Sequence, residues 1–286
     1  MTTTTAPTQA TRRSAAPAAR VGKVTFVHLL RSEWIKLTTL RSTWWTLGLT
    51  VLGMIGISLI FAASVRMLAT DMGGAEGVPE AGAFGTSTIT FGYFIGQITV
   101  AVLGALAISG EYSTGMIRST MAAAPRRLDV LGAKAVVIGA VVFVTGVVGT
   151  LLAWLVTLPI LPDVAAVSLA DGETWRVIAG TGAYLALIAL LSFGIGTIVR
   201  NSAGAISAVL GVLLMLPIAL QIIASMGQEW ALDVMRYLPG PAGERLMAVG
   251  EAAGAMATDF AAFSPAVGGL ILAGYVALVL VKKRDV

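Results

Sequence analysis

Residues 132–157 read GAKAVVIGAVVFVTGVVGTLLAWLVT, and Lys134 is the only charged residue among them. At about 1.5 Å per residue, a helix of this length crosses the ~30 Å hydrocarbon core of a bilayer. A helix on the surface of a soluble protein needs a polar face, and this stretch has none. It therefore predicts a transmembrane helix, with Lys134 extending its ammonium group to the nearer membrane surface.

The rest of the chain has the same character. Of its 286 residues, 57% are hydrophobic and 12% are charged, whereas charged residues make up about 25% of a typical soluble domain. We predict an all-α integral membrane protein in which residues 44–286 form a six-helix domain. The expected spans are 44–64, 88–109, 132–157, 177–199, 203–226 and 265–281. Pro217 lies inside the fifth span and is expected to kink it.

The distribution of charge predicts the orientation of these spans. If the N-terminus is cytoplasmic, most of the 19 Lys and Arg residues fall in cytoplasmic segments and most of the 15 Asp and Glu residues fall outside. This is the bias found in membrane proteins, so both termini are expected to be cytoplasmic. The bias also explains the basic net charge without a nucleic-acid partner. Residues 1–22 are Thr, Ala, Pro and Arg without an apolar run, which predicts a disordered tail and no signal peptide.

Residues 23–43 are expected to form an amphipathic helix on the inner surface of the bilayer. Apolar residues recur at helical spacing on one side, and basic or hydroxyl residues occupy the other, although Glu33 and Ile35 break the pattern. Basic groups opposite Trp and Leu suit an anionic membrane surface. The residues that we assign to this contact are Arg31, Glu33, Trp34 and Lys36. The alternative is a simple extension of the first span.

The outer segment 227–264 is predicted to form a short helical cap before the sixth span. Glu229–Leu238 is amphipathic, the turn Pro239-Gly240-Pro241 follows, and a second helix is expected at Glu244–Ala257. A flexible polar loop is the alternative.

Several classes of function lack their residues in this chain. There is no cysteine, no G-x-x-x-x-G-K-[ST] phosphate loop, no G-x-S-x-G elbow and no H-E-x-x-H pair. No Asp or Glu lies inside a predicted span, and the single histidine, His28, lies outside them. A proton-coupled carrier usually needs such a group at membrane depth. We therefore expect no enzyme and no proton relay, while sodium coupling through oxygen atoms stays open.

The segment between the second and third spans reads SGEYSTGMIRSTMAAAPRRLDVLGAK, residues 109–134. Glu111, Gly115 and Arg118 are spaced i, i+4, i+7, so in a helix they share one face. A carboxylate and a guanidinium on one face suit docking against another protein. The alternative is ordinary cytoplasmic positive charge on a solvated helix.

This segment resembles the membrane subunits of type-2 ATP-binding-cassette transporters. The resemblance rests on Glu-Tyr-x-x-Gly-Met-Ile-Arg at 111–118 with Pro-Arg-Arg at 125–127, and on SEWIKLTTLRSTWW at 32–45. It implies that two permeases, copies or homologues, form one pathway in the cytoplasmic membrane of a bacterium, above two separate ATPase subunits. ATP and Mg would be held by those ATPases, with no cofactor on this chain. By this resemblance the coupling contacts are Glu111, Tyr112, Gly115, Arg118, Pro125, Arg126 and Arg127.

Polar groups at membrane depth are scarce, and the resemblance implies that spans two and five line the pathway. The candidate lining residues are Tyr93, Gln97, Pro217 and Gln221. Either glutamine could instead be hydrogen-bonded between helices. A pathway so poor in charge predicts an apolar or amphiphilic cargo. The resemblance implies that the cargo is exported and that it is a drug, an antibiotic peptide or a lipid.

Small residues recur four positions apart at Gly92/Gly96, Gly146/Thr150 and Gly204/Ala208, which predicts close helix packing within one subunit.

Two other readings compete with the permease. One is an ion-coupled secondary carrier that dimerises, and the other is a membrane scaffold or immunity protein that binds a membrane-active peptide through its outer helices.

Overall fold

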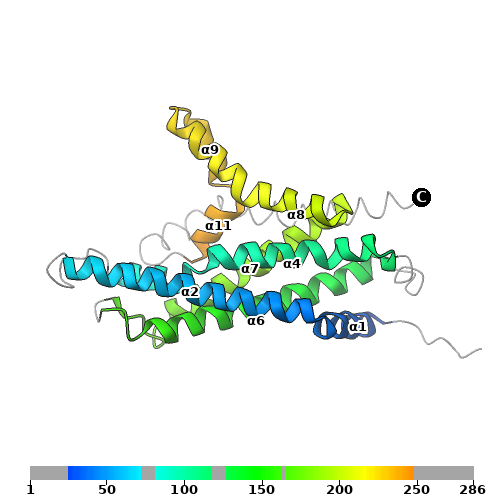
Figure 1. The fold of residues 1–286 in the computed structure, drawn as a ribbon, viewed down its shortest axis with the longest axis horizontal. Coiled ribbons are helices and arrows are strands. Elements are labelled where there is room, and N and C mark those ends of the chain that lie inside the picture. Colours follow the sequence, from blue (N-terminus) through cyan, green and yellow to red (C-terminus); the bar gives the residue numbers. More distant parts are fainter. Residues whose placement is uncertain (1–24, 72–80, 118–126, 163–164, 248–286) are drawn as a thin grey trace, which may run out of the picture.

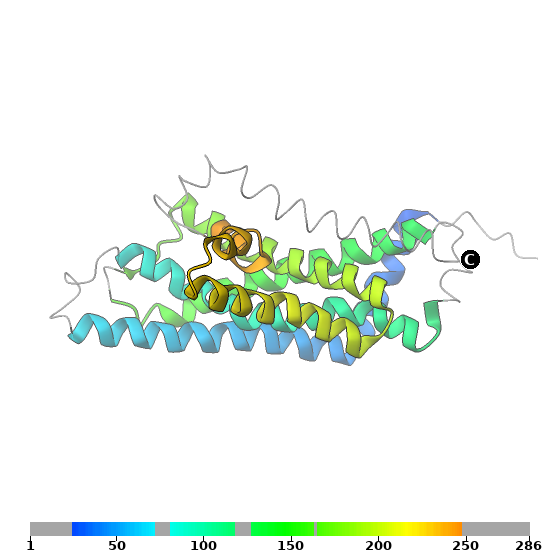
Figure 2. The ribbon, with the colours of Figure 1, turned by 90° about the horizontal axis from the view of Figure 1, so that it is seen from above.

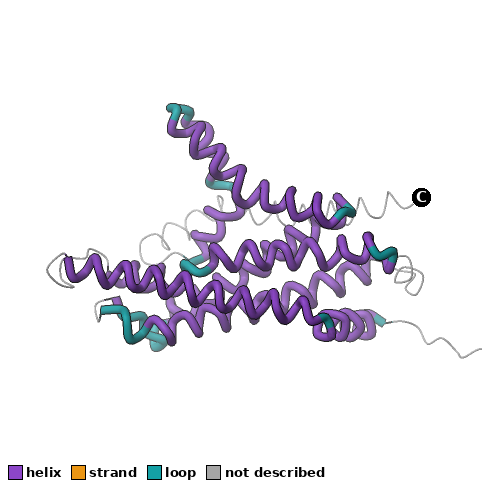
Figure 3. The backbone as a smooth tube through the Cα atoms, viewed as in Figure 1, coloured by secondary structure: helices purple, strands orange, loops and turns teal. Residues whose placement is uncertain are grey.

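The computed structural model describes residues 25–71, 81–117, 127–162 and 165–247, and every regular element in those ranges is helical (Figures 1 and 3). Five helices are long and apolar enough to cross a membrane. They are Arg41–Asp71, Phe84–Ser113, Leu128–Thr157, Gly172–Val199 and Ser202–Ser225. The chain is therefore an all-α, multi-pass membrane protein. The predicted sixth span, 265–281, and the predicted tail, 1–22, lie outside the described residues.

The elements follow one another along the chain as α1 (Phe26–Thr39), α2 (Arg41–Asp71), α3 (Ala81–Thr90), α4 (Tyr93–Ser113), α6 (Arg127–Thr157), α7 (Gly172–Val199), α8 (Ser202–Leu210), the π-helical turn η3 (Gly211–Met215), α9 (Leu216–Ser225), α10 (Glu229–Met235) and α11 (Pro239–Leu246). Each predicted span within the described residues corresponds to one long helix or to consecutive helices. The helices start earlier than predicted because hydropathy marks only the apolar part of a span, while polar turns at its ends stay helical.

The second span consists of two helices, which the sequence did not predict. Helix α3 ends at Thr90 and α4 begins at Tyr93. Gly92 lies between them, directly against the backbone of Met54 on α2, where a Cβ would overlap the Met54 carbonyl oxygen. Only glycine allows this approach, so the break sits where the second span touches the first.

Helix α7 is the centre of the bundle, with 67% of its most apolar window buried, against 17% for the fifth span. It packs on α4 and α6 through glycines. A Cβ at Gly104 of α4 would overlap the carbonyl oxygen of Ala189, and one at Gly146 of α6 would lie 2.8 Å from the Cα of Gly182. Close backbone packing of this kind supplies much of the association energy of helices in lipid. The predicted close packing at Gly92 and Gly146 within one subunit is confirmed.

The fifth span contains a π-helical turn at Gly211–Met215, just before Pro217. Proline has no N–H to donate, and its ring collides with the carbonyl four residues earlier in an α-helix. The wider turn relieves this collision, and Figure 1 shows α9 directed away from the line of α8. The predicted distortion at Pro217 is confirmed, with a π turn as its form.

The two short helices after the fifth span agree only partly with the prediction. Helix α10 covers most of the predicted amphipathic segment, and its Ala231 is buried with Leu220 and Leu238. The predicted turn at 239–241 is wrong, because α11 begins at Pro239. Proline suits a first helical turn, where the N–H has no partner within the helix. Most of the predicted helix 244–257 lies outside the described residues.

Helix α1 is separate from α2. Leu40 has an extended backbone, with φ −77° and ψ 115°, and this residue ends α1 before α2 begins. Figure 2 shows α1 running across the end of the bundle, crosswise to α2. The alternative that α1 merely extends the first span is therefore wrong.

Candidate functional site

Four parts of the chain meet at one end of the bundle, which we call the α1 end, and two of them, on α4 and α6, carry predicted coupling residues. It consists of α1, the last turn of α4, the first two turns of α6, and the turn between α7 and α8. Ion pairs and a cation–π contact connect these parts.

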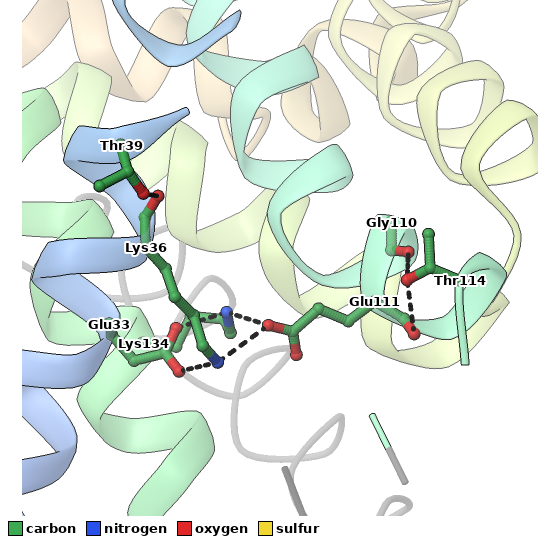
Figure 4. Close-up of polar contacts among 7 residues, drawn as sticks. All are labelled: Glu33, Lys36, Thr39, Gly110, Glu111, Thr114 and Lys134. Atoms are coloured by element: carbon green, nitrogen blue, oxygen red, sulfur yellow. Dashed lines mark hydrogen bonds and ion pairs between the residues drawn. The ribbon is translucent and has the colours of Figure 1, made fainter. Parts of the chain in front are cut away.

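Two lysines and two glutamates form a closed ring of alternating charge at this end (Figure 4). Lys134 Nζ of α6 lies 2.5 Å from Glu33 Oε2 of α1 and 2.8 Å from Glu111 Oε1 of α4. Lys36 Nζ lies 2.7 Å from Glu33 Oε1 and 3.4 Å from Glu111 Oε1. Each charge therefore touches two of the opposite sign. We call these four residues the charge ring.

Most of the charge ring is shielded from solvent. The exposed fraction of the side chain is 5% for Glu33, 8% for Lys134, 11% for Glu111 and 31% for Lys36. Charges are buried at this level only when they are paired. One carboxylate oxygen of the ring makes no hydrogen bond: Glu111 Oε2 is buried and has no partner in the described part of the chain.

The ring corrects two readings of the sequence. The expectation that Lys134 extends to the membrane surface is wrong, because its ammonium group points inward to two carboxylates. Glu33 broke the amphipathic pattern of α1 because it lies on the buried side of that helix, between Leu30 and Leu37. The sequence did contain one indication of a buried ion pair, namely a single carboxylate on an apolar helix face. Such a group needs a cation nearby when it is buried.

Lys36 is the most solvent-accessible member of the ring. Partial burial lowers the pKa of Lys36, but the hydrogen bond to Glu33 and the negative charges of Glu111 and Glu33 outweigh burial. The net effect raises the pKa of Lys36 above its ordinary value of 10.5. The ammonium form is thus stabilised at physiological pH.

The predicted docking face does not form on one helix. Helix α4 ends at Ser113, and Gly115 has a left-handed backbone with φ 72°. Glycine is favoured in this conformation, which commonly terminates helices. Glu111 and Gly115 therefore do not lie on one continuous helix face. Arg118, Pro125 and Arg126 lie outside the described residues, and Arg127 is the first residue of α6.

Tyr112 connects the end of α4 to the turn after α7. The Arg200 guanidinium carbon lies 5.3 Å from the centroid of the Tyr112 ring, which is cation–π geometry. Arg200 has φ 57°, and the next residue, Asn201, caps α8 by accepting a hydrogen bond from the Gly204 amide. The sequence indicated this contact only weakly, because Arg200 appears there as a single positive charge between two predicted spans.

The outward side of α1 carries the other residues assigned to the membrane contact. Arg31 is exposed, and Trp34 is 51% exposed. Trp44 and Trp45, in the first turn of α2, are exposed too. Exposed indole and guanidinium groups are typical of a membrane–water interface.

A second polar network extends from buried side chains at the start of α4 to the exposed Glu244 of α11. The Tyr93 hydroxyl donates to Glu244 Oε1 of α11 at 2.8 Å, and the Tyr184 hydroxyl donates to Gln97 Oε1 at 2.6 Å. The rings of Tyr93 and Tyr184 meet edge to face. Sequence reasoning missed Glu244 and Tyr184, because neither had a recognisable partner in the chain.

The candidate lining residues divide into two groups. Tyr93 and Gln97 are buried in this network, with Gln97 bonded between α4 and α7 as its alternative reading expected. Gln221 is exposed on α9, and Pro217 is half-buried. Their assignment to a pathway stays a prediction.

The chemistry available in the described ranges is electrostatic. No group of three His, Cys, Asp or Glu residues that could hold a metal ion occurs there. Hydroxyl groups inside the helices mostly donate to carbonyls of their own helix, as Thr181 does to Val177 and Ser192 to Ile188.

Comparison with protein families finds a match. The family described as ABC-2 family transporter protein matches residues 27–239, from the second residue of α1 to the first of α11. The matched region includes the whole charge ring and the Tyr112–Arg200 contact. A search among curated proteins finds no significant match.

Proposed function

Because the chain belongs to the ABC-2 family of transporter proteins, it is the permease subunit of an ATP-binding-cassette transporter, and we propose that it exports an apolar or amphiphilic compound. In this family ATP hydrolysis takes place on separate partner chains. The observation that carries the proposal is the family match, which extends over all five described spans. It also includes the charged α1 end.

We propose that the α1 end faces the cytoplasm and docks on the ATPase. The excess of Lys and Arg in the segments at this end supports the orientation. The contact would use the surface of the last turn of α4 near Tyr112 and Gly115, together with the segment containing Arg118, Pro125, Arg126 and Arg127. Glu111 would act from behind this surface, because its carboxylate is turned toward Lys36 and Lys134.

The nature of the cargo is inferred from the interior of the bundle. Between the charge ring and the Tyr93–Glu244 contact, the described core consists of apolar side chains such as Val100, Ile108 and Ile188, apart from a few hydrogen-bonded amide and hydroxyl groups. Transfer of a compact ion past such groups would carry a large desolvation cost. A drug, antibiotic peptide or lipid fits this environment better.

The proposed assembly contains two permeases and two ATPases in the cytoplasmic membrane of a bacterium. The second permease would be a copy of this chain or a homologue, and ATP and Mg would bind to the ATPases. The lipid bilayer would contact the outward side of α1, where Arg31 and Trp34 are exposed.

Co-purification tests this function. The tagged chain is expressed with its neighbouring genes and isolated in mild detergent, and the expected result is a stoichiometric ABC ATPase. Arg118→Glu should release the ATPase. Arg176→Met, which removes an exposed arginine of α7, should retain it. Arg118 is the better site to vary, because any change at Glu111 also disturbs the charge ring.

Two results would contradict the proposal. One is a chain that purifies without an ATPase even after crosslinking. The other is transport that persists after complete ATP depletion while an ion gradient remains, which would favour the secondary carrier.

A further inference from the structure

The charge ring joins three elements that are far apart in the sequence. Glu33 and Lys36 lie on α1, Glu111 on the last turns of α4, and Lys134 on the second turn of α6 (Figure 4). The ring carries no net charge, and each lysine bridges one carboxylate of α1 and one of α4.

Stability alone does not explain such a ring. A buried ion pair is often no more stabilising than apolar side chains of the same volume, because both charges must leave water. Here one carboxylate oxygen, Glu111 Oε2, is also left without a partner in the described chain. What ion pairs do provide is a fixed registry, since each charge must stay opposite its partners.

A short connection joins α1 to α2. The two helices are separated by one extended residue, Leu40, and α1 lies crosswise to α2 (Figure 2). Apart from the ring, α1 contacts the bundle through a hydrogen bond from the Trp44 indole of α2 to the Thr38 carbonyl oxygen and through apolar side chains such as Leu37, and Phe26 lies near Gly132. Apolar contacts permit sliding more readily than a ring of opposed charges does.

We propose that the charge ring is a positioning joint that makes α1, the end of α4 and the start of α6 move as one rigid unit when the ATPase binds nucleotide. Glu33 and Lys134 act as positioning residues, through the helices that they hold. This inference rests on the proposed function, because it requires a docked ATPase to drive the movement.

Distances between spin labels test the joint directly. The chain has no cysteine, so paired cysteines can be introduced without background. Ser32→Cys with Ser113→Cys spans α1 and the end of α4, and Ser32→Cys with Ser64→Cys spans α1 and the far part of α2; all three positions are exposed. Both pairs are measured in the complex with the ATPase, without nucleotide and after trapping with ATP and vanadate.

The expected result is a Ser32–Ser113 distance that is the same in both states, while the Ser32–Ser64 distance changes. In Lys134→Met the Ser32–Ser113 distance should become nucleotide-dependent, and the change at Ser32–Ser64 should shrink. Lys134→Arg, which keeps the charge, and the inverted ring Glu33→Lys/Lys36→Glu/Glu111→Lys/Lys134→Glu should both restore the fixed distance. Arg176→Met is the matched control and should behave like the unaltered chain.

A Ser32–Ser113 distance that changes with nucleotide in the unaltered chain overturns the joint. So does a distance that stays fixed in Lys134→Met, because the ring is then a structural feature only. If the inverted ring does not fold, Lys134→Arg against Lys134→Met decides the question. A complex that traps nucleotide but moves neither pair refutes the joint and leaves the proposed function standing, whereas failure to bind any ATPase refutes the proposed function itself.

Discussion

At the scale of single residues, the charge ring shows that the structural role of a charged residue depends on the partners it finds in the fold. In the sequence, Glu33 is an exception to a helical pattern and Lys134 is a lone charge near the end of a span. In the structure they are 2.5 Å apart and shielded from solvent. The pairing could not be read from the sequence, because 100 residues separate the two and no local pattern states which helix ends meet. The requirement that a buried carboxylate finds a cation was nevertheless present.

Removal of one member of the ring should destabilise the fold strongly. Lys134→Met leaves two buried carboxylates facing each other with only Lys36 between them. Breaking a buried ion pair from one side typically costs about 3–5 kcal/mol. Unfolding in mixed micelles with increasing denaturant would measure this loss.

The control for Lys134→Met is Arg176→Met, which removes an ion pair whose side chains are 40% and 44% exposed. Exposed pairs contribute about 0–1 kcal/mol, so this variant should stay close to the unaltered chain. Equal losses in the two variants would contradict a special role of the buried ring.

Lys36 predicts a dependence of stability on pH. The pKa of Lys36 is raised above its ordinary value of 10.5, so the folded state holds this proton more tightly than the unfolded state does. The stability that Lys36 contributes is therefore fully present below pH 10.5 and is lost as the pH rises through the higher pKa of the folded state. Melting temperatures from pH 9 to about pH 11.5 should fall more for the unaltered chain than for Lys36→Met. Parallel curves would contradict the interaction.

At the scale of elements, the sequence predicted which segments are helical better than where they end or bend. Apolar runs identified the five described spans, since length and hydropathy suffice for that. The break at Gly92 was not predicted, because it depends on contact with Met54 of another helix. The turn predicted at Pro239 is wrong, because proline is common both in turns and in the first turn of a helix.

The contact between α4 and α7 should be sensitive to a single methyl group. In Gly104→Ala the new Cβ would overlap the carbonyl oxygen of Ala189, so the helices must separate. Overpacking of this kind costs about 1–3 kcal/mol. The loss should appear as a lower melting temperature in detergent.

Gly56→Ala in α2 is the matched control, because nothing lies within 4 Å of the added Cβ. Alanine is about 0.5–1 kcal/mol better than glycine inside a helix, so this variant should be neutral or slightly stabilising. A Gly104→Ala protein as stable as Gly56→Ala would contradict the observed packing.

The position of α11 depends on similar close contacts. A Cβ at Gly243 would overlap the ring of Tyr184, and Glu244 accepts the hydrogen bond of Tyr93. Gly243→Ala should therefore displace α11 and make it more accessible to protease. Gly240→Ala, where a Cβ has open space, should not. Equal rates of cleavage in the two variants would show that α11 is not seated on α7.

At the scale of the whole molecule, the α1 end is where an ATPase would need to act. It brings together α1, α4, α6 and the α7–α8 turn, and α7 is the most buried of the five described spans. The sequence indicated the coupling segment through its resemblance to a family, and the family match confirms the family. The coupling role of the segment stays a prediction. The orientation of this end toward the cytoplasm remains a prediction from the distribution of Lys and Arg.

The most direct test of the central claim is site-specific crosslinking to the ATPase. A photoreactive maleimide is attached either at Ser113→Cys, at the α1 end, or at Ser64→Cys, in the far part of α2, in the otherwise cysteine-free chain. The account predicts a covalent adduct with a co-expressed ABC ATPase from Ser113→Cys and none from Ser64→Cys. An adduct from Ser64→Cys, or no adduct from Ser113→Cys while the ATPase is bound, would contradict it.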